Sequence, residues 1–291
     1  MLKRFSYSEG MNTLPLTKKV AVLSALVEGV SVRATSRMTG VAKGTILRLL
    51  ADVGTACAAY QNRTLRGLAC QRVQIDEIWS FCYAKEKTVK AKQIAIRAAG
   101  DVWTFVAIEA QTKLVLGWRV GNRDGISATA FVKDIAGRLA SRIQLTTDGH
   151  KMYLEAVEAA FGIAVDYAML VKLYGAETDG QRTYSPAQCI GARIEPITGA
   201  PDRRHISTSY IERQNLTMRM SMRRFTRLTN GFSKKIENHL HSVALFYMHY
   251  NFARIHQTLR VTPAMEAGVS DHVWSLEDIV GLAEKAQRLA A

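Results

Sequence analysis

The stretch "RVQIDEIWSFC", residues 72–82, decides the fold because it places an aspartate inside one of the most apolar segments of the chain. Its β-branched and aromatic residues predict a β-strand. Side chains alternate along a strand, so Asp76 is expected to share one face with Ile78 and Ser80, and Glu77 to point to the opposite face. A buried, unpartnered carboxylate costs several kcal/mol. Asp76 therefore needs a metal ion, another cation or a proton.

The segments after this strand predict an α/β fold. Three further extended segments are expected at 92–100, 101–110 and 113–121, with a hairpin at the polar residues 111–113. Helical and extended patterns then alternate, which predicts a mixed sheet covered by helices on both faces. The expected order is a helix at 126–140, a strand at 143–149, a helix at 151–162, a strand at 164–175, a long surface loop at 176–207 with room for one short strand, a single helix at 208–230 and a helix at 233–254.

The first sixty residues predict a helix-turn-helix. Apolar periodicity indicates helices at 17–30 and 31–38, a turn at Thr39 and Gly40, and a third helix within 41–61. The start of the third helix presents Lys43, Thr45 and Arg48 outward, as a recognition helix does in the major groove of DNA. The alternative is a small three-helix bundle without a ligand.

The overall charge favours a polyanionic partner. Lys and Arg outnumber Asp and Glu by 39 to 25, which gives a formal charge of +14.

The longest apolar stretch near the C-terminus, residues 242–253, is too short to cross a bilayer, and the N-terminus lacks the apolar core of a signal peptide. The four cysteines form no Cys-x-x-Cys pair, so the sequence suggests neither a zinc site nor a disulfide framework. We expect a soluble, cytoplasmic protein that does not contact membranes.

Two further acids could act together with Asp76. Asp148 ends a predicted strand and precedes a glycine, although it could simply cap the following helix. Glu212 begins a helix, where a carboxylate also complements the helix dipole. Together, three acids converging at one sheet edge describe a site for two Mg²⁺ ions, with Mn²⁺ as a substitute, that acts on phosphodiesters.

Four motifs in order carry a resemblance to a known family. They are "QIDEIWSF" (74–81), "LTTDGHKMY" (145–153), "SYIERQNLTMR" (209–219) and "YNFARIHQTLRVTPAMEAG" (250–268). Over roughly residues 70–268 the chain resembles the DDE transposases of bacterial insertion sequences, most closely the insertion-sequence-one family. That resemblance implies a ribonuclease H-like catalytic core. Members of the family often carry an N-terminal zinc-finger-like element with paired cysteines, and this chain has none there. Either the helix-turn-helix alone recognises the transposon ends, or the chain is truncated at its start.

The resemblance also implies roles for individual residues. It makes Asp76, Asp148 and Glu212 a metal-binding catalytic triad, and it places Asn215 and Arg219 on the helix face of Glu212, near the active site or the DNA backbone. The implied activity is cleavage at transposon ends to free 3′-OH groups, followed by their metal-dependent transfer to target DNA. The implied partners are double-stranded end and target DNA and at least one further copy of the chain, in a nucleoid-associated bacterial setting.

Basic residues extend the expected DNA surface. Residues 213–235 contain seven Lys or Arg and no acid, so this segment can follow a phosphate backbone, although a solvated helix face would look the same. The expected division is a helix-turn-helix domain at 1–62, a catalytic domain at 70–255 and a helical tail at 256–291. The expected DNA contacts are Lys43, Thr45, Arg48, Asn215, Arg219, Arg223, Arg227, Arg254 and Arg260.

Three alternative functions share some of these sequence features. Arg254 and His256 lie close together as in a tyrosine recombinase, but no tyrosine follows Tyr250 to serve as the nucleophile. A non-catalytic helix-turn-helix regulator would need none of the three acids. A ribonuclease H-like nuclease would cut without joining. The last two alternatives stay open at the level of sequence.

Overall fold

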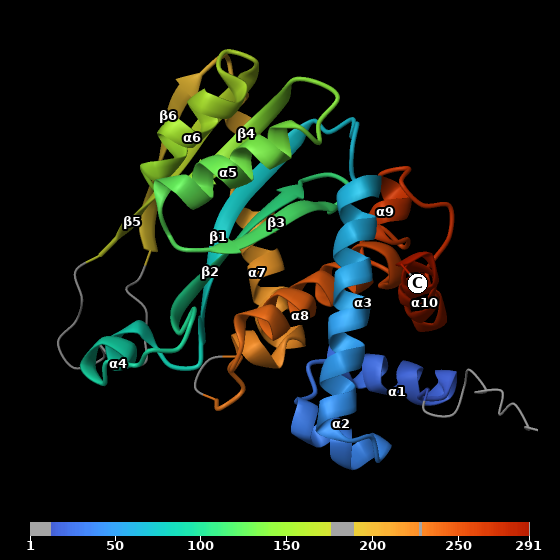
Figure 1. Ribbon diagram of the computed structural model, residues 1–291. Coiled ribbons are helices and arrows are strands. Elements are labelled where there is room, and N and C mark those ends of the chain that lie inside the picture. Colours follow the sequence, from blue (N-terminus) through green and yellow to red (C-terminus); the bar gives the residue numbers. More distant parts are fainter. Residues whose placement is uncertain (1–12, 176–188, 227–228, 291) are drawn as a thin grey trace, which may run out of the picture.

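The computed structural model describes residues 13–175, 189–226 and 229–290, and its centre is a six-stranded sheet in the order β3-β2-β1-β4-β5-β6 (Figure 1). The pairs β1–β2, β2–β3 and β5–β6 are antiparallel, whereas β4 runs parallel to both β1 and β5. The fold is therefore a mixed α/β sheet, as the sequence predicts, and most of its strand pairs are antiparallel. The strands are β1 Arg72–Cys82, β2 Gly100–Glu109, β3 Val115–Gly121, β4 Ile143–Asp148, β5 Val165–Tyr174 and β6 Cys189–Thr198.

Helices cover both faces of this sheet because its strands are apolar on both sides. One face packs against α5 (Gly125–Ala136) and α6 (Met152–Phe161), through residues such as Phe105 on β2. The other face packs against α7 (Ser209–Ser221) and α8 (Ile236–Met248), through Val106 on the same strand. Figure 1 shows α5 and α6 in front of β1 and α7 and α8 beyond it. Phe105 and Val106 are consecutive residues, and they therefore point to opposite faces of the sheet and pack into different hydrophobic clusters, as the alternation of side chains along a strand requires.

Three helices precede the sheet where the sequence predicts them: α1 (Leu16–Val27), α2 (Val32–Thr39) and α3 (Lys43–Thr64). The side chain of Ser31 accepts the N–H of Ala34 at 3.2 Å and so starts α2, and Gly40 ends that helix with a left-handed φ of 72°. No helix in the described part of the chain is long and apolar enough to span a membrane.

Helix α3 continues from this N-terminal bundle into the main core. It lies along α8 at a glycine contact, where a Cβ on Gly54 would come within 2.5 Å of the Cβ of His241. The side chain of Gln61 donates to the carbonyl of Ala244 at 3.1 Å. Helix α10 (Leu276–Ala290) adds an ion pair from Glu284 to Lys19 at 2.8 Å. The three predicted segments, 1–62, 70–255 and 256–291, therefore share one hydrophobic cluster, and their division into domains stays a prediction.

Two local predictions are wrong, and the first concerns residues 92–100. They are not a strand: α4 (Glu86–Ala91) is followed by turns, and β2 begins only at Gly100. The predicted loop does contain the one strand for which the sequence left room, but β6 is ten residues long and not short. It pairs with β5 through its backbone while most of its side chains are exposed. Residues 176–188 of that loop lie outside the described part of the chain.

The helix that carries Glu212 is also shorter than predicted. It ends at Ser221 because Met222 turns extended, and Met222 and Phe225 bury their side chains against the sheet. Arg223 therefore belongs to a short 3₁₀ helix, Arg223–Phe225, and not to the single helix predicted at 208–230. Arg227 lies outside the described residues. The remaining short elements are a 3₁₀ helix at Arg203–His205, a π-helix at His249–Ala253 and α9 at Pro263–Glu266.

Candidate metal centre

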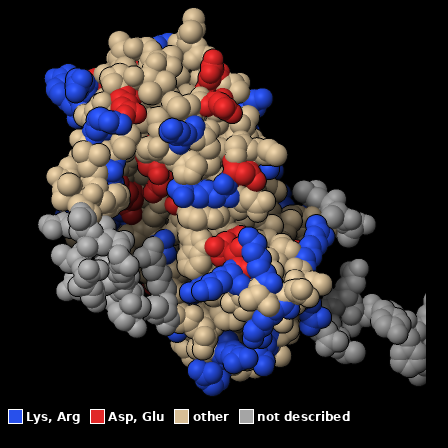
Figure 2. All heavy atoms as spheres, turned by 90° about the vertical axis from the view of Figure 1, so that its left-hand side faces the viewer, with Lys and Arg blue, Asp and Glu red and all other residues tan. Residues whose placement is uncertain are grey.

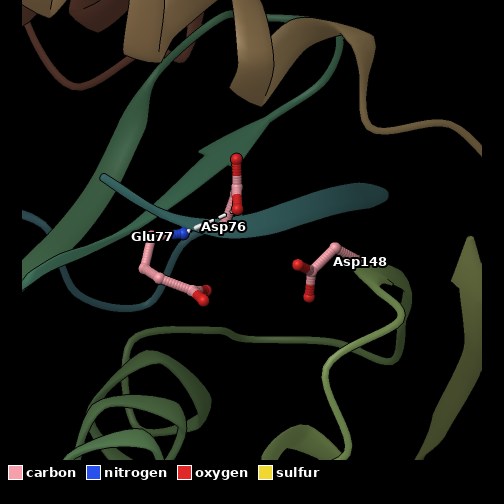
Figure 3. Close-up of side chains that lie close together, drawn as sticks. All are labelled: Asp76, Glu77 and Asp148. Carbon is pink, nitrogen blue, oxygen red and sulfur yellow. Dashed lines mark hydrogen bonds between the residues drawn. The ribbon is translucent and has the colours of Figure 1, made fainter. Parts of the chain in front are cut away.

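Three carboxylates meet in the middle of the sheet. Asp76 and Glu77 lie on β1 and Asp148 ends β4, and each offers one oxygen within 4.8 Å of the others (Figure 3). We call these three residues the acidic cluster. Parallel pairing of Ile75 with Thr147 brings the end of β4 beside Asp76. In Figure 3 Asp76 and Glu77 leave β1 on opposite sides, as predicted, and Asp148 reaches them from the neighbouring strand.

Asp76 is the most perturbed acid of the cluster. Its Oδ1 accepts the N–H of Glu77 at 2.8 Å, and its Oδ2 accepts the side-chain amide of Asn215 at 2.9 Å. Burial and then the charges of Glu77 and Asp148 raise the pKa of Asp76 to about 7, with a smaller contribution from Glu212. In the absence of a cation, Asp76 holds a proton near neutral pH far more readily than an exposed aspartate does.

Asp148 does not cap the helix that follows it. Helix α6 begins at Met152 after Lys151, with no side-chain cap, and the Oδ1 of Asp148 instead accepts the N–H of His150 at 3.1 Å. The simple capping interpretation is therefore wrong. Burial and the charge of Glu77 raise the pKa of Asp148, against the opposing effects of the His150 hydrogen bond and nearby positive charge.

Glu77 is the member of the cluster that the sequence did not suggest. Its carboxylate is almost fully buried, at 1% exposure, and both oxygens are held: one by Nε of Arg123 at 2.6 Å, the other by the hydroxyl of Tyr153 at 2.7 Å. Arg123 also lies over the ring of Trp103, with 4.6 Å to the centroid. The sequence shows Glu77 only as an acid within an apolar strand. Its partners Arg123 and Tyr153 are distant in sequence, so their contacts with Glu77 could not be predicted.

Glu212 lies outside the acidic cluster. Its carboxylate pairs with the ammonium of Lys172 on β5 at 2.6 Å and accepts the hydroxyl of Thr208. Burial lowers the pKa of Lys172, but the hydrogen bond and charge of Glu212 outweigh it, so the net shift of that pKa is upward. Glu212 is near enough to raise the pKa of Asp76. Its position in the first turn of α7 also suits the helix dipole, so both interpretations of Glu212 stay open.

The start of α7 is fixed on β1 next to the cluster. The side-chain oxygen of Gln74 accepts the N–H groups of Tyr210 and Ile211, both at 3.0 Å. One turn further along, Asn215 is buried, and its side-chain amide donates to Asp76. Its Oδ1 is also buried and has no hydrogen-bond partner among the described residues. Arg219, on the same helix, is partly exposed.

The other predicted DNA contacts lie on the surface. Figure 2, seen from the β5 and β6 side, shows acidic side chains in a hollow at mid-height and Lys and Arg side chains around and below it. Lys43, Arg48, Arg223, Arg254 and Arg260 are exposed, and Thr45 is partly exposed.

The donor set fits a hard divalent cation. All candidate ligand atoms are carboxylate oxygens, and in the described part of the chain neither Asp76 nor Asp148 forms an ion pair. Both oxygens of Glu77 are already held by Arg123 and Tyr153, so Asp76 and Asp148 are the members of the acidic cluster whose carboxylates form no ion pair among the described residues.

Comparisons with known proteins add little. No family model matches the chain, and neither does any curated protein. Among solved structures, the chain matches a piggyBac transposase synaptic complex with hairpin DNA at 11% identity and a TM-score of 0.36, covering 95% of this chain and 72% of that one. A TM-score this low carries no conclusion about shared function, so the proposals below rest on the residues of this chain.

Proposed function

We propose that the chain is a metal-dependent DNA transposase of the DDE type, with a ribonuclease H-like core similar to that of the insertion-sequence-one family. The observation that carries the proposal is the meeting of Asp76 and Asp148. Two acids 72 residues apart in sequence are brought together at the centre of the sheet, half-buried, with raised pKa values and no basic partner among the described residues. Such a pair is costly to keep charged unless a cation binds it.

Asp76 and Asp148 would hold Mg²⁺ or Mn²⁺, with Glu212 as a further ligand once it leaves Lys172. A pair of such ions, when bound, supplies activation of the attacking oxygen and stabilisation of the leaving 3′ oxygen of a phosphodiester. The protein's own contribution is orientation. The amide of Asn215 fixes one oxygen of Asp76, and the backbone N–H of Glu77 fixes the other.

The N-terminal helices would bind the transposon ends. Lys43 and Arg48 are exposed at the start of α3 while Ile46 between them is buried, which is the arrangement that a recognition helix requires. The turn before α2 also lies close to the end of α7, since a Cβ on Gly29 would come within 3.1 Å of the carbonyl of Ser221. DNA held by these helices would therefore lie near the helix that carries Glu212. Assembly of at least two copies and a cytoplasmic, nucleoid-associated location belong to the same proposal.

A strand-cleavage and joining assay tests the proposal. The purified protein is incubated with Mg²⁺, a supercoiled target and labelled DNA taken from the sequences that flank the reading frame. Asp76→Asn and Asp148→Asn should each lower cleavage and joining more than about 100-fold, while Asp271→Asn, at an exposed acid remote from the cluster, retains both. Cut ends without joined product would indicate a nuclease. Binding without any Mg²⁺-dependent cleavage would indicate a regulator.

A further inference from the structure

A cavity of about 750 Å³ opens between the N-terminal helices and the segment that follows α7. It is separate from the acidic cluster, and no residue of the cluster lines it. Its walls come from α1, α2 and α3 on one side and from residues 222–224 and 230–246 on the other. We call it the basic groove, because the charged residues that line it are Arg33, Lys43, Arg223, Arg224 and Lys234, and none of the described lining residues is acidic.

The positive charge of the basic groove has no acidic counterpart in the groove itself among the described residues. In the described part of the chain, none of these five side chains forms an ion pair. Arg224 is the most enclosed: it donates to the hydroxyl of Ser233 at 2.9 Å, and burial lowers its pKa to about 10. A cation that is partly desolvated without an acid beside it is stabilised by an external anion.

The walls between these cations are apolar and in part aromatic. Val30, Leu47, Phe232 and Phe246 line the groove, as do the amides of two asparagines. Paired bases in a duplex are stacked inside the helix and cannot reach such a wall. An unpaired base can, and single-stranded nucleic acids are bound in this way, with phosphates on cations and bases on apolar or aromatic surfaces.

The groove lies at the end of α7, the helix whose Asn215 contacts Asp76 of the acidic cluster. It begins where α7 ends, because Met222 and Arg223 are among its lining residues. Glu212 is ten residues earlier on that helix, a distance of about 15 Å at 1.5 Å per residue. Gly231 lies close to Arg223, since a Cβ on Gly231 would lie 2.6 Å from the carbonyl oxygen of Arg223. These two residues of the same wall therefore pack against each other.

We propose that the basic groove binds an unpaired nucleotide of the DNA strand that enters the acidic cluster, with its phosphate on Arg33, Lys234 and Arg223 and its base against Phe232 and the neighbouring aliphatic side chains. This inference rests on the proposed function, because it takes DNA as the substrate. It goes beyond that function by assigning a second site, for single-stranded rather than double-stranded DNA. The groove then favours DNA whose end is frayed or carries an overhang.

Fluorescence anisotropy with two labelled DNAs tests this inference. One is a short blunt duplex and the other is the same duplex with a three-nucleotide single-stranded overhang. Wild-type protein should bind the overhang form about tenfold more tightly, the effect of one stacked, phosphate-anchored base. Arg33→Ala and Lys234→Ala should each remove most of that preference and leave the affinity for the blunt duplex within about twofold.

Two matched controls lie on the same elements. Arg37 is exposed on α2 one turn after Arg33, and Lys235 follows Lys234 directly, yet neither lines the groove. Arg37→Ala and Lys235→Ala remove the same charge and should keep the full preference. An equal loss in the controls would show a general charge effect and overturn the assignment of the groove.

The same titrations separate this inference from the proposed function. If blunt and overhang DNA bind equally well, the groove proposal fails while DNA binding stands. If neither DNA binds, the proposed function fails as well. A free deoxynucleoside monophosphate is titrated in the same way. If it binds the wild type with the free energy that the overhang adds to duplex binding, and if Arg33→Ala removes that binding, the groove is a site for a free nucleotide and the strand proposal is overturned.

Photocrosslinking gives a direct readout of position. An overhang that contains 5-iododeoxyuridine should crosslink to the peptide around Phe232, identified by mass spectrometry of the digested adduct. Phe232→Ala should reduce this adduct several-fold. A crosslink confined to α7 or to the acidic cluster would contradict the placement of the unpaired base in the groove.

Discussion

The ammonium nitrogen of Lys172 lies 2.6 Å from a carboxylate oxygen of Glu212, and this contact links β5 to the first turn of α7 beside the acidic cluster. The charges of Glu212 and Asp76 both raise the pKa of Lys172. Lys172 therefore supplies positive charge at the point where a divalent cation would supply it. If Glu212 is a metal ligand, the ammonium and the cation compete for the same carboxylate.

Removal of Lys172 should strengthen metal binding. Lys172→Met keeps the length and apolar body of the side chain but frees Glu212. We therefore expect Mn²⁺ to bind about two- to fivefold more tightly, which corresponds to the free energy of a partly exposed ion pair. Mn²⁺ titration followed by electron paramagnetic resonance measures this affinity. Lys172→Arg retains the competing charge and serves as the control. Unchanged affinity in Lys172→Met, together with unchanged affinity in Glu212→Gln, would show that Glu212 is a structural residue of the helix and not a ligand.

Asn215 should act through Asp76. Asn215→Ala removes the amide that holds one oxygen of Asp76, and we expect metal affinity and cleavage to fall about 10- to 100-fold, as for other groups that orient a metal ligand. The thermal midpoint of the metal-free protein should change little or rise, because the buried, unpartnered Oδ1 of Asn215 is removed as well. Leu216→Ala, at the next and exposed position of α7, is the control. Equal losses in both variants would point to damage to the helix and not to the lost amide.

Apolar periodicity predicted most of the fold. The N-terminal helices, the β2–β3 hairpin and the succession from α5 to β5 were all visible because each buries a regular set of apolar side chains. The failures occur where that signal is absent or misleading. The full length of strand β6 was not visible because backbone pairing holds this strand while most of its side chains are exposed, and Ile96, in the segment wrongly predicted as a strand, is itself 43% exposed.

The site was predictable only in part. Asp76 and Asp148 could be found because an acid within or at the end of an apolar strand is unusual, and the structure does bring them together. Glu77 and Lys172 could not be found from sequence, since what defines them is contact with Tyr153, Arg123 and Glu212 on distant segments. The basic groove was likewise hidden, because its five cations come from three separate stretches of the chain.

The stability of the metal-free protein should depend on the charge of Asp76. Its pKa in the folded protein is about 7 against a usual 3.8, so the folded state binds the proton more tightly than the unfolded state. The contribution of Asp76 to the free energy of unfolding is therefore greatest below about pH 4 and is lost as the pH rises to about 7. Asp76→Asn should be more stable than wild type at pH 8 by on the order of 2 kcal/mol, with little difference at pH 4.

Denaturant unfolding in the presence of a chelator, at both pH values, measures this difference. Addition of Mg²⁺ should reverse the order at pH 8, because the cation stabilises the wild-type carboxylate and an amide binds it poorly. An Asp76→Asn variant that is less stable than wild type at pH 8 in chelator would contradict the charge argument.

The two glycines of α3 should respond oppositely to the same substitution. A Cβ at Gly54 would lie 2.5 Å from the Cβ of His241 and 2.7 Å from its Cα, so α3 and α8 would have to separate. Gly54→Ala should lower the free energy of unfolding by about 1–3 kcal/mol. A Cβ at Gly44 meets nothing within 4 Å, and alanine is the better helix former, so Gly44→Ala should raise the free energy of unfolding by about 0.5–1 kcal/mol. Urea unfolding of the two variants measures both changes. Equal effects of the two substitutions would mean that α3 and α8 are not in contact at Gly54.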